Sequence, residues 1–202
     1  MPRPFGRFTC AALLLAAFEL ASVPAAQACA CCSERGSRID AGFTLDDATR
    51  TQVERMTFAK DAVLTVDERD EPSSPSAGMG SKYKLTMVRA AGDMTFAFRD
   101  PAGRGGTLRF AIPNTVWIFQ VDPFGGEKDE GLGPSLYKEW RLTANVTGDG
   151  LFHRAAPAGQ KVTLIFHGRG RGCTEAEHFT HWSLLLHGPA GKMTLYGALE
   201  RL

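Results

Sequence analysis

The chain has little net charge and no long uninterrupted apolar run. Its 23 lysine and arginine residues nearly balance its 22 aspartate and glutamate residues, which gives a formal net charge of +1. Nucleic-acid binding requires a clustered basic face, and adsorption to an anionic membrane requires a basic amphipathic segment. The near-neutral composition therefore argues against both kinds of partner. The apolar run 8–18 stops before Glu19, short of the roughly 20 residues that a membrane-spanning helix needs.

The chain also lacks the short motifs of several enzyme classes. It contains no HExxH, no P-loop and no dinucleotide-binding fingerprint. The serines of "PSL" (134–136) and "WSL" (182–184) lack the flanking glycines of a nucleophile elbow. The stretch "GRGRG" (168–172) lacks the strand-to-helix context of a phosphate loop, so we interpret it as a flexible basic hairpin loop. Enzymatic functions are therefore not favoured.

Residues 1–28 have the pattern of an export signal. Two arginines form a short positive region, an apolar stretch follows, and small residues at 26–28 end it. We expect cleavage before Cys29, which leaves residues 29–202 as a single domain in the bacterial periplasm or outside the cell. Without the signal the formal net charge falls to zero, because the segment carries one more basic than acidic residue.

A lipoprotein signal would be cut at the same place. Such signals prefer a large aliphatic residue three positions before the cysteine, whereas this chain has Ala26 there. A single acyl chain also holds a protein to a membrane only weakly. A lipid anchor at Cys29 is therefore the less favoured alternative, and we expect no transmembrane segment after signal cleavage.

Several segments carry apolar residues at every second position, a pattern that predicts half-buried strands. The expected inward faces are Tyr83, Leu85 and Met87; Met94, Phe96 and Phe98; Leu108, Phe110 and Ile112; Val162, Leu164 and Phe166; and Trp182, Leu184 and Leu186. Short breaks rich in Gly, Pro and Asp separate these segments and are typical of hairpin turns. Tight turns make neighbouring strands antiparallel.

We therefore expect a mainly β protein, an antiparallel barrel or sandwich of about eight to ten strands that resembles a lipocalin in size only. At most one short N-terminal helix is expected, over residues 44–56, with Thr44 as its N-cap. A barrel of about eight strands is either filled by side chains or holds one small ligand. No motif matches a known family residue by residue.

The cysteines are concentrated in the segment 29–36. After signal cleavage four remain, and every complete pairing joins Cys173 to one of Cys29, Cys31 and Cys32. Bridges between cysteines one or two positions apart form only with strain. We expect one long-range disulfide from Cys173 to this segment, with the other two cysteines strained together or free.

A metal centre is the alternative interpretation of the same residues. Two thiols close in sequence suit Cu(I) or Zn(II), and two histidines follow Cys173 with the spacing HxxH. The implied cofactor is copper or zinc, with the ligand set Cys29, Cys31, Cys32, Cys173, His178 and His181. Against it, histidines three positions apart on a strand face opposite ways.

One aromatic pair suggests a ligand site. Tyr137 and Trp140 follow a Gly/Pro-rich loop, and we interpret them as the rim of a pocket, with a core tryptophan as the competing interpretation. Taken together, the sequence favours a non-catalytic exported β-domain that binds a small apolar ligand or an envelope protein. The alternative is a copper- or zinc-binding protein of the cell envelope, and a thiol-redox or hydrolytic enzyme comes third.

Overall fold

The computed structural model describes residues 33–65, 81–125 and 134–201. The elements, in chain order, are β1 (Arg38–Thr44), α1 (Asp47–Arg55), β2 (Phe58–Thr65), β3 (Ser81–Ala90), β4 (Asp93–Arg99), β5 (Gly105–Ala111), β6 (Thr115–Val121), β7 (Leu136–Asn145), β8 (Thr147–Gly148), η1 (Gly150–Phe152), β9 (Lys161–Gly170), η2 (Ala176–His178), β10 (Phe179–Gly188) and β11 (Gly191–Leu199). Within these ranges, none of the helices has the length and apolar character needed to cross a membrane.

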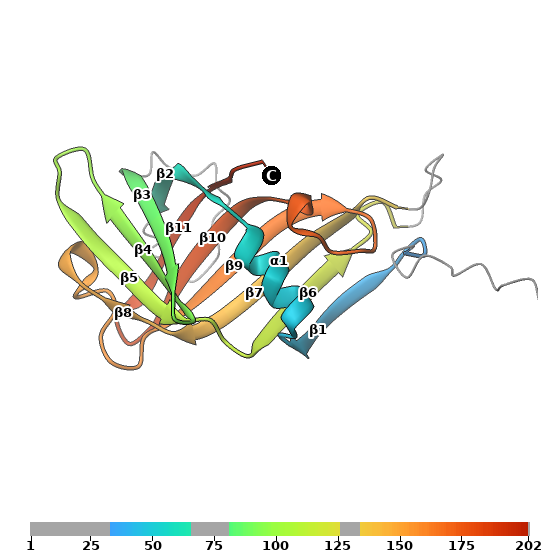
Figure 1. The fold of residues 1–202 in the computed structure, drawn as a ribbon, viewed down its shortest axis with the longest axis horizontal. Helices are drawn as coiled ribbons and strands as arrows, with labels where there is room; N and C mark the ends of the chain where they lie inside the picture. The colour runs from blue at the N-terminus through green and yellow to red at the C-terminus, as the bar shows by residue number, and fades with distance from the viewer. Residues whose placement is uncertain (1–32, 66–80, 126–133, 202) are drawn as a thin grey trace, which may run out of the picture.

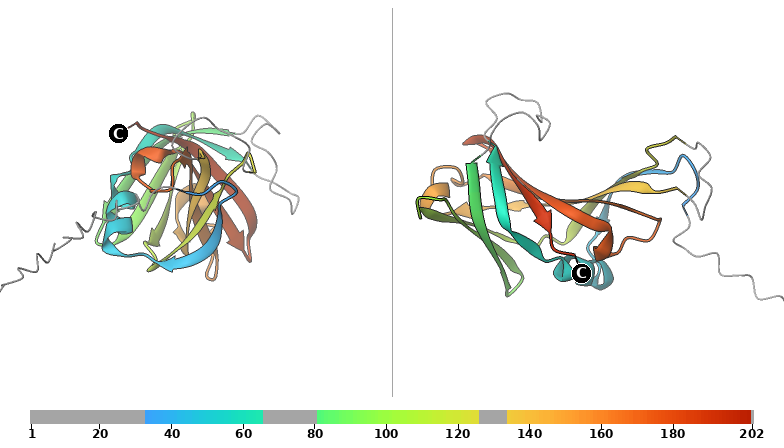
Figure 2. Two further views of the ribbon diagram at one scale, coloured as in Figure 1. Left: turned by 90° about the vertical axis from the view of Figure 1, so that its right-hand side faces the viewer. Right: turned by 90° about the horizontal axis from the view of Figure 1, so that it is seen from above.

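The strands form one antiparallel sheet in the order β1-β6-β7-β9-β10-β11-β2-β3-β4-β5-β8. The sheet is strongly curled and elongated (Figures 1 and 2). The prediction of a mainly β, antiparallel fold with one short helix is confirmed. The finer architecture differs from the prediction, because eleven strands form a single sheet that does not close into a barrel.

The end strand β8 follows β7 closely in the chain, but among the described residues no ladder joins the two strands. β8 begins two positions after the last residue of β7, and it pairs with β5 through Leu108↔Gly148 and Arg109↔Thr147. The chain then turns away into η1. At the other end, β1 pairs with β6 and lies outside β7 in the strand order. Closure depends on strand stagger, which hydrophobic periodicity does not encode.

The inside of the curl is filled by the apolar faces that the sequence predicts. Phe96, Phe166 and Trp182 are at most 1% exposed, and Phe58 lies within 5.1–6.0 Å of all three rings. Such ring pairs contribute about 0.5–1.5 kcal/mol each beyond the burial of apolar area. Leu85 is buried, but its predicted companions Tyr83 and Met87 on β3 are only half-buried.

Helix α1 is shorter than predicted and has a different cap. Thr44 is the last residue of β1 and pairs with Thr115, so it is not available to start the helix. The N-cap is Asp46, whose carboxylate accepts a hydrogen bond from the Thr49 amide at 2.8 Å. A strand that runs up to Thr44 leaves only a two-residue turn before the helix. At the other end, Arg89 of β3 donates to the carbonyl of Met56 at 2.7 Å and so satisfies the C-terminus.

Candidate functional site

A connected group of polar side chains lies on the outer face of the sheet, across the neighbouring strands β7, β9 and β10. Alternation along β7 turns Tyr137, Glu139 and Arg141 outward. The register of β7 with β9 sets Glu139 directly opposite His167. On β10, Ser183 lies one step further along the same face. Residues from three distant parts of the chain are thus brought together by strand pairing.

Four of these side chains form a continuous chain of hydrogen bonds. Ser183 Oγ lies 2.9 Å from His167 Nε2, and His167 Nδ1 lies 3.1 Å from Tyr137 Oη. The Tyr137 hydroxyl donates to Glu139 Oε1 at 2.6 Å. A phenol has one proton and uses it at the carboxylate, so a neutral His167 donates from Nδ1 to Tyr137 and accepts from Ser183 at Nε2. The chain therefore fixes the tautomer of His167.

The surroundings of these hydrogen-bonded side chains shift the pKa values of Glu139 and Tyr137. Burial raises the pKa of Glu139, but the neighbouring His167 ring and the hydrogen bonds from Tyr137 and Arg141 outweigh burial and lower this pKa to about 2. Burial, followed by the hydrogen bond to Glu139, raises the pKa of Tyr137 far above its usual value of 10.0. At neutral pH, Glu139 is therefore a carboxylate and Tyr137 a neutral phenol.

Arg141 closes the far end of the chain. Its Nε and Nη2 atoms lie 2.7 and 2.5 Å from Glu139 Oε2. Its guanidinium also lies over the ring of Phe119, 5.5 Å from the centroid, and Arg38 of β1 approaches the same ring at 5.3 Å. These neighbours leave the Glu139 side chain 12% exposed and the His167 side chain 26% exposed. The carboxylate is thus shielded, whereas the imidazole reaches solvent.

A second hydroxyl–imidazole pair lies on the same face. Thr163 Oγ1 is 3.2 Å from His187 Nε2 and 2.9 Å from Thr143 Oγ1. Among the described residues no carboxylate or phenol is bonded to the His187 ring, in contrast to His167. The outer face therefore holds two similar pairs, of which one is backed by a carboxylate.

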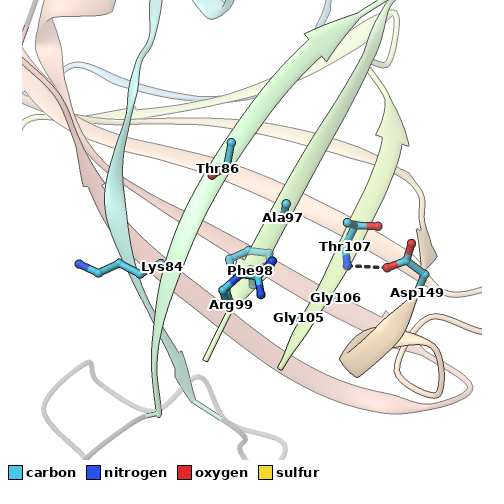
Figure 3. Close-up of a pocket in the computed structure, with 9 residues that line it drawn as sticks. All are labelled: Lys84, Thr86, Ala97, Phe98, Arg99, Gly105, Gly106, Thr107 and Asp149. Carbon is cyan, nitrogen blue, oxygen red and sulfur yellow. Dashed lines mark hydrogen bonds between the residues drawn. The ribbon is translucent and has the colours of Figure 1, made fainter. Parts of the chain in front are cut away.

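Two shallow hollows also lie on the outer face. The larger, of about 390 Å³, spans β3, β4 and β5 and is bordered by Lys84, Arg99 and Asp149 (Figure 3). Each of these groups is already engaged: Lys84 with Asp61, Arg99 with the Gly103 carbonyl, and Asp149 with the Thr107 amide. We therefore assign no ligand to this hollow. The smaller, of about 170 Å³, is lined by Gly42, Thr115, Val116, Trp117, Arg141 and Thr143.

Lys138 is the least expected residue of the inner face. It is 1% exposed, its ammonium donates to the carbonyl of Cys173, and Nζ lies 3.2 Å from His178 Nδ1. Burial lowers its pKa to about 8, although Glu175 acts in the opposite direction. Burial and then the charge of Lys138 also lower the pKa of His178. Lys138 thus anchors the loop that carries Cys173.

This loop folds back tightly onto β9. A Cβ atom at Gly168 would lie 2.0 Å from the His178 carbonyl oxygen, and one at Gly170 would lie 2.5 Å from the His178 ring. The stretch 168–172 is therefore not a hairpin loop throughout, because β9 runs to Gly170. Its first two glycines, Gly168 and Gly170, are required where the loop approaches the strand.

The predicted pocket rim of Tyr137 and Trp140 is not formed. Residues three apart on a strand face opposite sides, and Trp140 lies on the inner face at 2% exposure, 5.2 Å from the Phe179 ring. Tyr137 lies on the outer face in the hydrogen-bonded chain. Trp140 is therefore the core tryptophan of the competing interpretation.

The predicted ligands for a metal are only partly within the described residues. Cys173 is disulfide-bonded, and a sulfur in a disulfide is not the thiolate that binds a metal. His178 faces the ammonium of Lys138, while His181 is exposed and lies 2.9 Å from the Thr180 hydroxyl. In the part of the chain that the structure describes, no three His, Cys, Asp or Glu residues form a group that could hold a metal ion.

The remaining predicted ligands, Cys29, Cys31 and Cys32, lie outside the described residues, as does the signal at 1–28. Export, the lipid anchor, the partner of Cys173 and a metal centre built on the N-terminal cysteines therefore stay predictions.

The sequence patterns did not identify five of these residues as site residues: Glu139, Arg141, His167, Ser183 and Lys138. Two-residue spacing in "YKEWR" indicates that Tyr137, Glu139 and Arg141 share a face, and this signal was available in the sequence. The approach of His167 and Ser183 depends on the order β7-β9-β10, which no local pattern contains.

In comparisons with known proteins, no family model, curated protein or solved structure matches the chain.

Proposed function

We propose that this protein is an exported β-domain that binds a protein partner along the edge strand β1. The observation that carries the proposal is the exposure of large apolar side chains on that strand. Ile39 is 37% exposed and Phe43 is 46% exposed, and both lie on the face of β1 that continues the inner side of the sheet. Trp117 of the neighbouring strand β6 is 46% exposed on the other face.

The interior of the curl favours a protein partner over a small apolar ligand. Pockets for such ligands are concave, mostly apolar and about 300–1,000 Å³ in volume. The inward residues Leu108, Leu164 and Leu184 have no exposed surface and are packed among aromatic rings. The hollow of comparable size lies on the outer face and is bordered by charged groups. The described interior supports a filled core.

The position of β1 indicates the kind of partner. Within the described residues β1 pairs with β6 alone, so its second edge presents unpaired backbone groups. Exposed edges of this kind accept an extended segment of another chain as an added strand. Such a segment would carry apolar side chains at alternate positions, facing Ile39 and Phe43. The partner we propose is an extended segment of an envelope protein.

The disulfide bond of Cys173 supports the exported location. Disulfides persist in oxidising compartments such as the bacterial periplasm and are rare in the cytosol. This agrees with the export signal predicted at residues 1–28.

Site-specific photo-crosslinking in producing cells tests the proposal. A benzophenone amino acid replaces Phe43 in one variant and Val88 in a control variant, since Val88 of β3 is 53% exposed and lies far from β1 in the strand order. We expect a discrete heterologous adduct from position 43 and none from position 88. Adding Ile39→Lys should remove that adduct, because a lysine on an edge strand opposes strand addition.

Three outcomes would overturn the proposal. Equal adducts from both positions would show non-specific contact, and the absence of any adduct from position 43 would leave no partner at this edge. An adduct consisting of two copies of this chain would replace the envelope protein by self-association.

A further inference from the structure

We propose that Ser183 and His167 form a nucleophile–base pair that accepts acyl groups from small carboxylic esters. The inference goes beyond the proposed binding function and uses a different surface. It rests on the connected geometry of the outer face: Ser183 Oγ lies 2.9 Å from His167 Nε2, within the range in which a general base takes a hydroxyl proton.

The backing of His167 distinguishes this pair from an ordinary surface hydrogen bond. The Nδ1 atom lies 3.1 Å from Tyr137 Oη and 3.5 Å from Glu139 Oε1. The Tyr137 hydroxyl donates to Glu139, so its oxygen accepts from His167 Nδ1 and holds the imidazole in the tautomer that leaves Nε2 free to accept a proton. The same logic orients the base in serine hydrolases: nucleophile, base, and an acidic group behind the base.

The carboxylate is suited to stabilise a positive imidazolium. Glu139 is held ionised by the Arg141 guanidinium and by the hydrogen bond that the Tyr137 hydroxyl donates to it. When His167 takes a proton, the new charge faces a fixed negative group that is 12% exposed and therefore weakly screened. Tyr137 and Glu139 act as positioning residues, because neither contacts the reacting serine.

The step balances without a cofactor. As Ser183 Oγ forms a bond to the ester carbonyl carbon, its proton moves to His167 Nε2. The bond from the carbonyl carbon to the alcohol oxygen then breaks, and the proton on Nε2 moves to the leaving alkoxide. A water molecule, deprotonated by the same nitrogen, hydrolyses the acyl-serine and restores both side chains. The net reaction consumes one ester and one water and yields one acid and one alcohol.

The setting of Ser183 limits the rate and the substrate. β10 pairs with β9 on one side and β11 on the other, so the backbone N–H groups around Ser183 serve the sheet and form no oxyanion hole. The pair should therefore accelerate the reaction only by the factor that general-base catalysis contributes, about 10²–10⁴-fold. This favours small esters with good leaving groups that can reach the half-buried Ser183 on the outer face of the sheet.

The first experiment is covalent labelling of the exported full-length product with a fluorophosphonate probe, followed by peptide mass spectrometry. The probe transfers its phosphonyl group to the serine oxygen and releases fluoride and the serine proton. We expect labelling at Ser183. Two internal controls should stay unlabelled: Ser135, which is exposed and precedes β7, and Thr163, whose partner His187 has no acidic group behind it.

Variants distinguish a Ser183 that is activated by His167 from a Ser183 that is labelled only because it is accessible to the probe. Ser183→Ala should lose the label and lower the hydrolysis of 4-nitrophenyl acetate to the level of the uncatalysed reaction. His167→Gln should slow labelling by 10²-fold or more, and His167→Ala should recover labelling when imidazole is added. The circular dichroism spectrum and unfolding midpoint of each variant establish that it is folded.

The role of Tyr137 is tested by measuring which nitrogen of the His167 imidazole carries the proton. In ¹⁵N NMR spectra of the unmodified protein, His167 should carry its proton on Nδ1. Tyr137→Phe should shift this tautomer balance and slow labelling, whereas a merely structural tyrosine would leave the His167 signals unchanged.

Two results would overturn the inference. The first is a folded protein whose Ser183 takes no label. The second is labelling of Ser183 that proceeds equally fast in His167→Gln, because that would show a serine reacting without a base. Both results are independent of the cross-linking at Phe43, so the two proposals succeed or fail separately.

Discussion

At the residue scale, neighbouring groups decide which charges the outer and inner faces of β7 carry. Glu139 and Lys138 are adjacent in the sequence but face opposite sides of the sheet. Glu139 is surrounded by donors that favour its charged form, whereas the burial of Lys138 opposes its charge. Folding therefore lowers the pKa of both groups. At neutral pH this stabilises the folded protein through Glu139 and destabilises it through Lys138.

Glu139 should stabilise the protein at neutral pH and lose this effect in acid. Its folded-state pKa of about 2 lies below the ordinary value of 4.5, so its contribution is complete above pH 4.5 and disappears as the pH falls toward 2. By this linkage the protein loses about 2 kcal/mol of its free energy of unfolding between pH 7 and pH 3 through this group. Urea unfolding of Glu139→Gln should lack that part of the pH dependence.

The control for this measurement is Glu200→Gln, at an exposed carboxylate after β11. It should retain the profile of the unmodified protein. If Glu139→Gln retains it as well, the hydrogen bonds at Glu139 do not contribute to stability.

Lys138 should produce a further rise of stability with pH, in the alkaline range. Its folded-state pKa of about 8 lies below 10.5, so between these values the unfolded chain binds more protons and stability rises with pH. The gain should reach about 2 kcal/mol between pH 7 and pH 9.5. Lys138→Met, which keeps the volume of the side chain, should abolish this rise. A rise of the same size in Lys138→Met would assign it to another group.

At the element scale, the turn between β1 and α1 shows how a strand limits the helix that follows it. β1 continues to Thr44, so the helix takes its cap from Asp46 and begins at Asp47. A helix capped by Thr44 and a helix capped by Asp46 both have an acidic first turn. The sequence pattern therefore located the helix but misplaced its start. Strand faces were predicted well for β4, β9 and β10, because burial on one side imposes period two.

Asp46→Ala should lower the free energy of unfolding measurably, because the helix loses its N-cap side chain. The lost interaction is the 2.8 Å hydrogen bond from the Thr49 amide. Denaturant unfolding measures the cost, and faster hydrogen exchange at the Thr49 amide locates it. The matched control is Asp47→Ala, which keeps the cap and removes a neighbouring charge. If the two variants behave alike, the charge near the helix end matters and the hydrogen bond does not.

At the scale of the whole molecule, the disulfide bond of Cys173 is expected to link distant parts of the chain. Cys173 is disulfide-bonded, and every other cysteine lies between positions 10 and 32. With the predicted partner Cys29, Cys31 or Cys32, the bridge closes a loop of well over a hundred residues, for which the chain-entropy model gives about 4 to 5 kcal/mol and measurements typically give 2–4 kcal/mol. From the inner face of the sheet, the Lys138 ammonium donates a hydrogen bond to the carbonyl of the same cysteine.

Reduction should lower the free energy of unfolding by about 2–4 kcal/mol. Urea unfolding with and without dithiothreitol measures the change, and alkylation with intact-mass analysis counts the thiols that reduction releases. In Cys173→Ser the reductant should have a much smaller effect. An unmodified protein whose stability is the same with and without reductant would show that the bridge does not constrain the unfolded chain.

The sequence by itself determined the faces of the strands and hence the content of the core. Phe96, Phe166 and Trp182 were predicted to point inward from their spacing alone, since a strand that is buried on one side must alternate. The sequence also supplied the outward row of Tyr137, Glu139 and Arg141, although not its partners.

Only the tertiary structure decided which strands are neighbours. The order β7-β9-β10 sets Glu139 opposite His167 and brings Ser183 beside it, and the open curl leaves β1 as an edge with Ile39 and Phe43 exposed. Strand order and register are set by packing and turn geometry over the whole sheet. Local periodicity records whether a residue is buried, and it carries no information about which distant residue lies beside it.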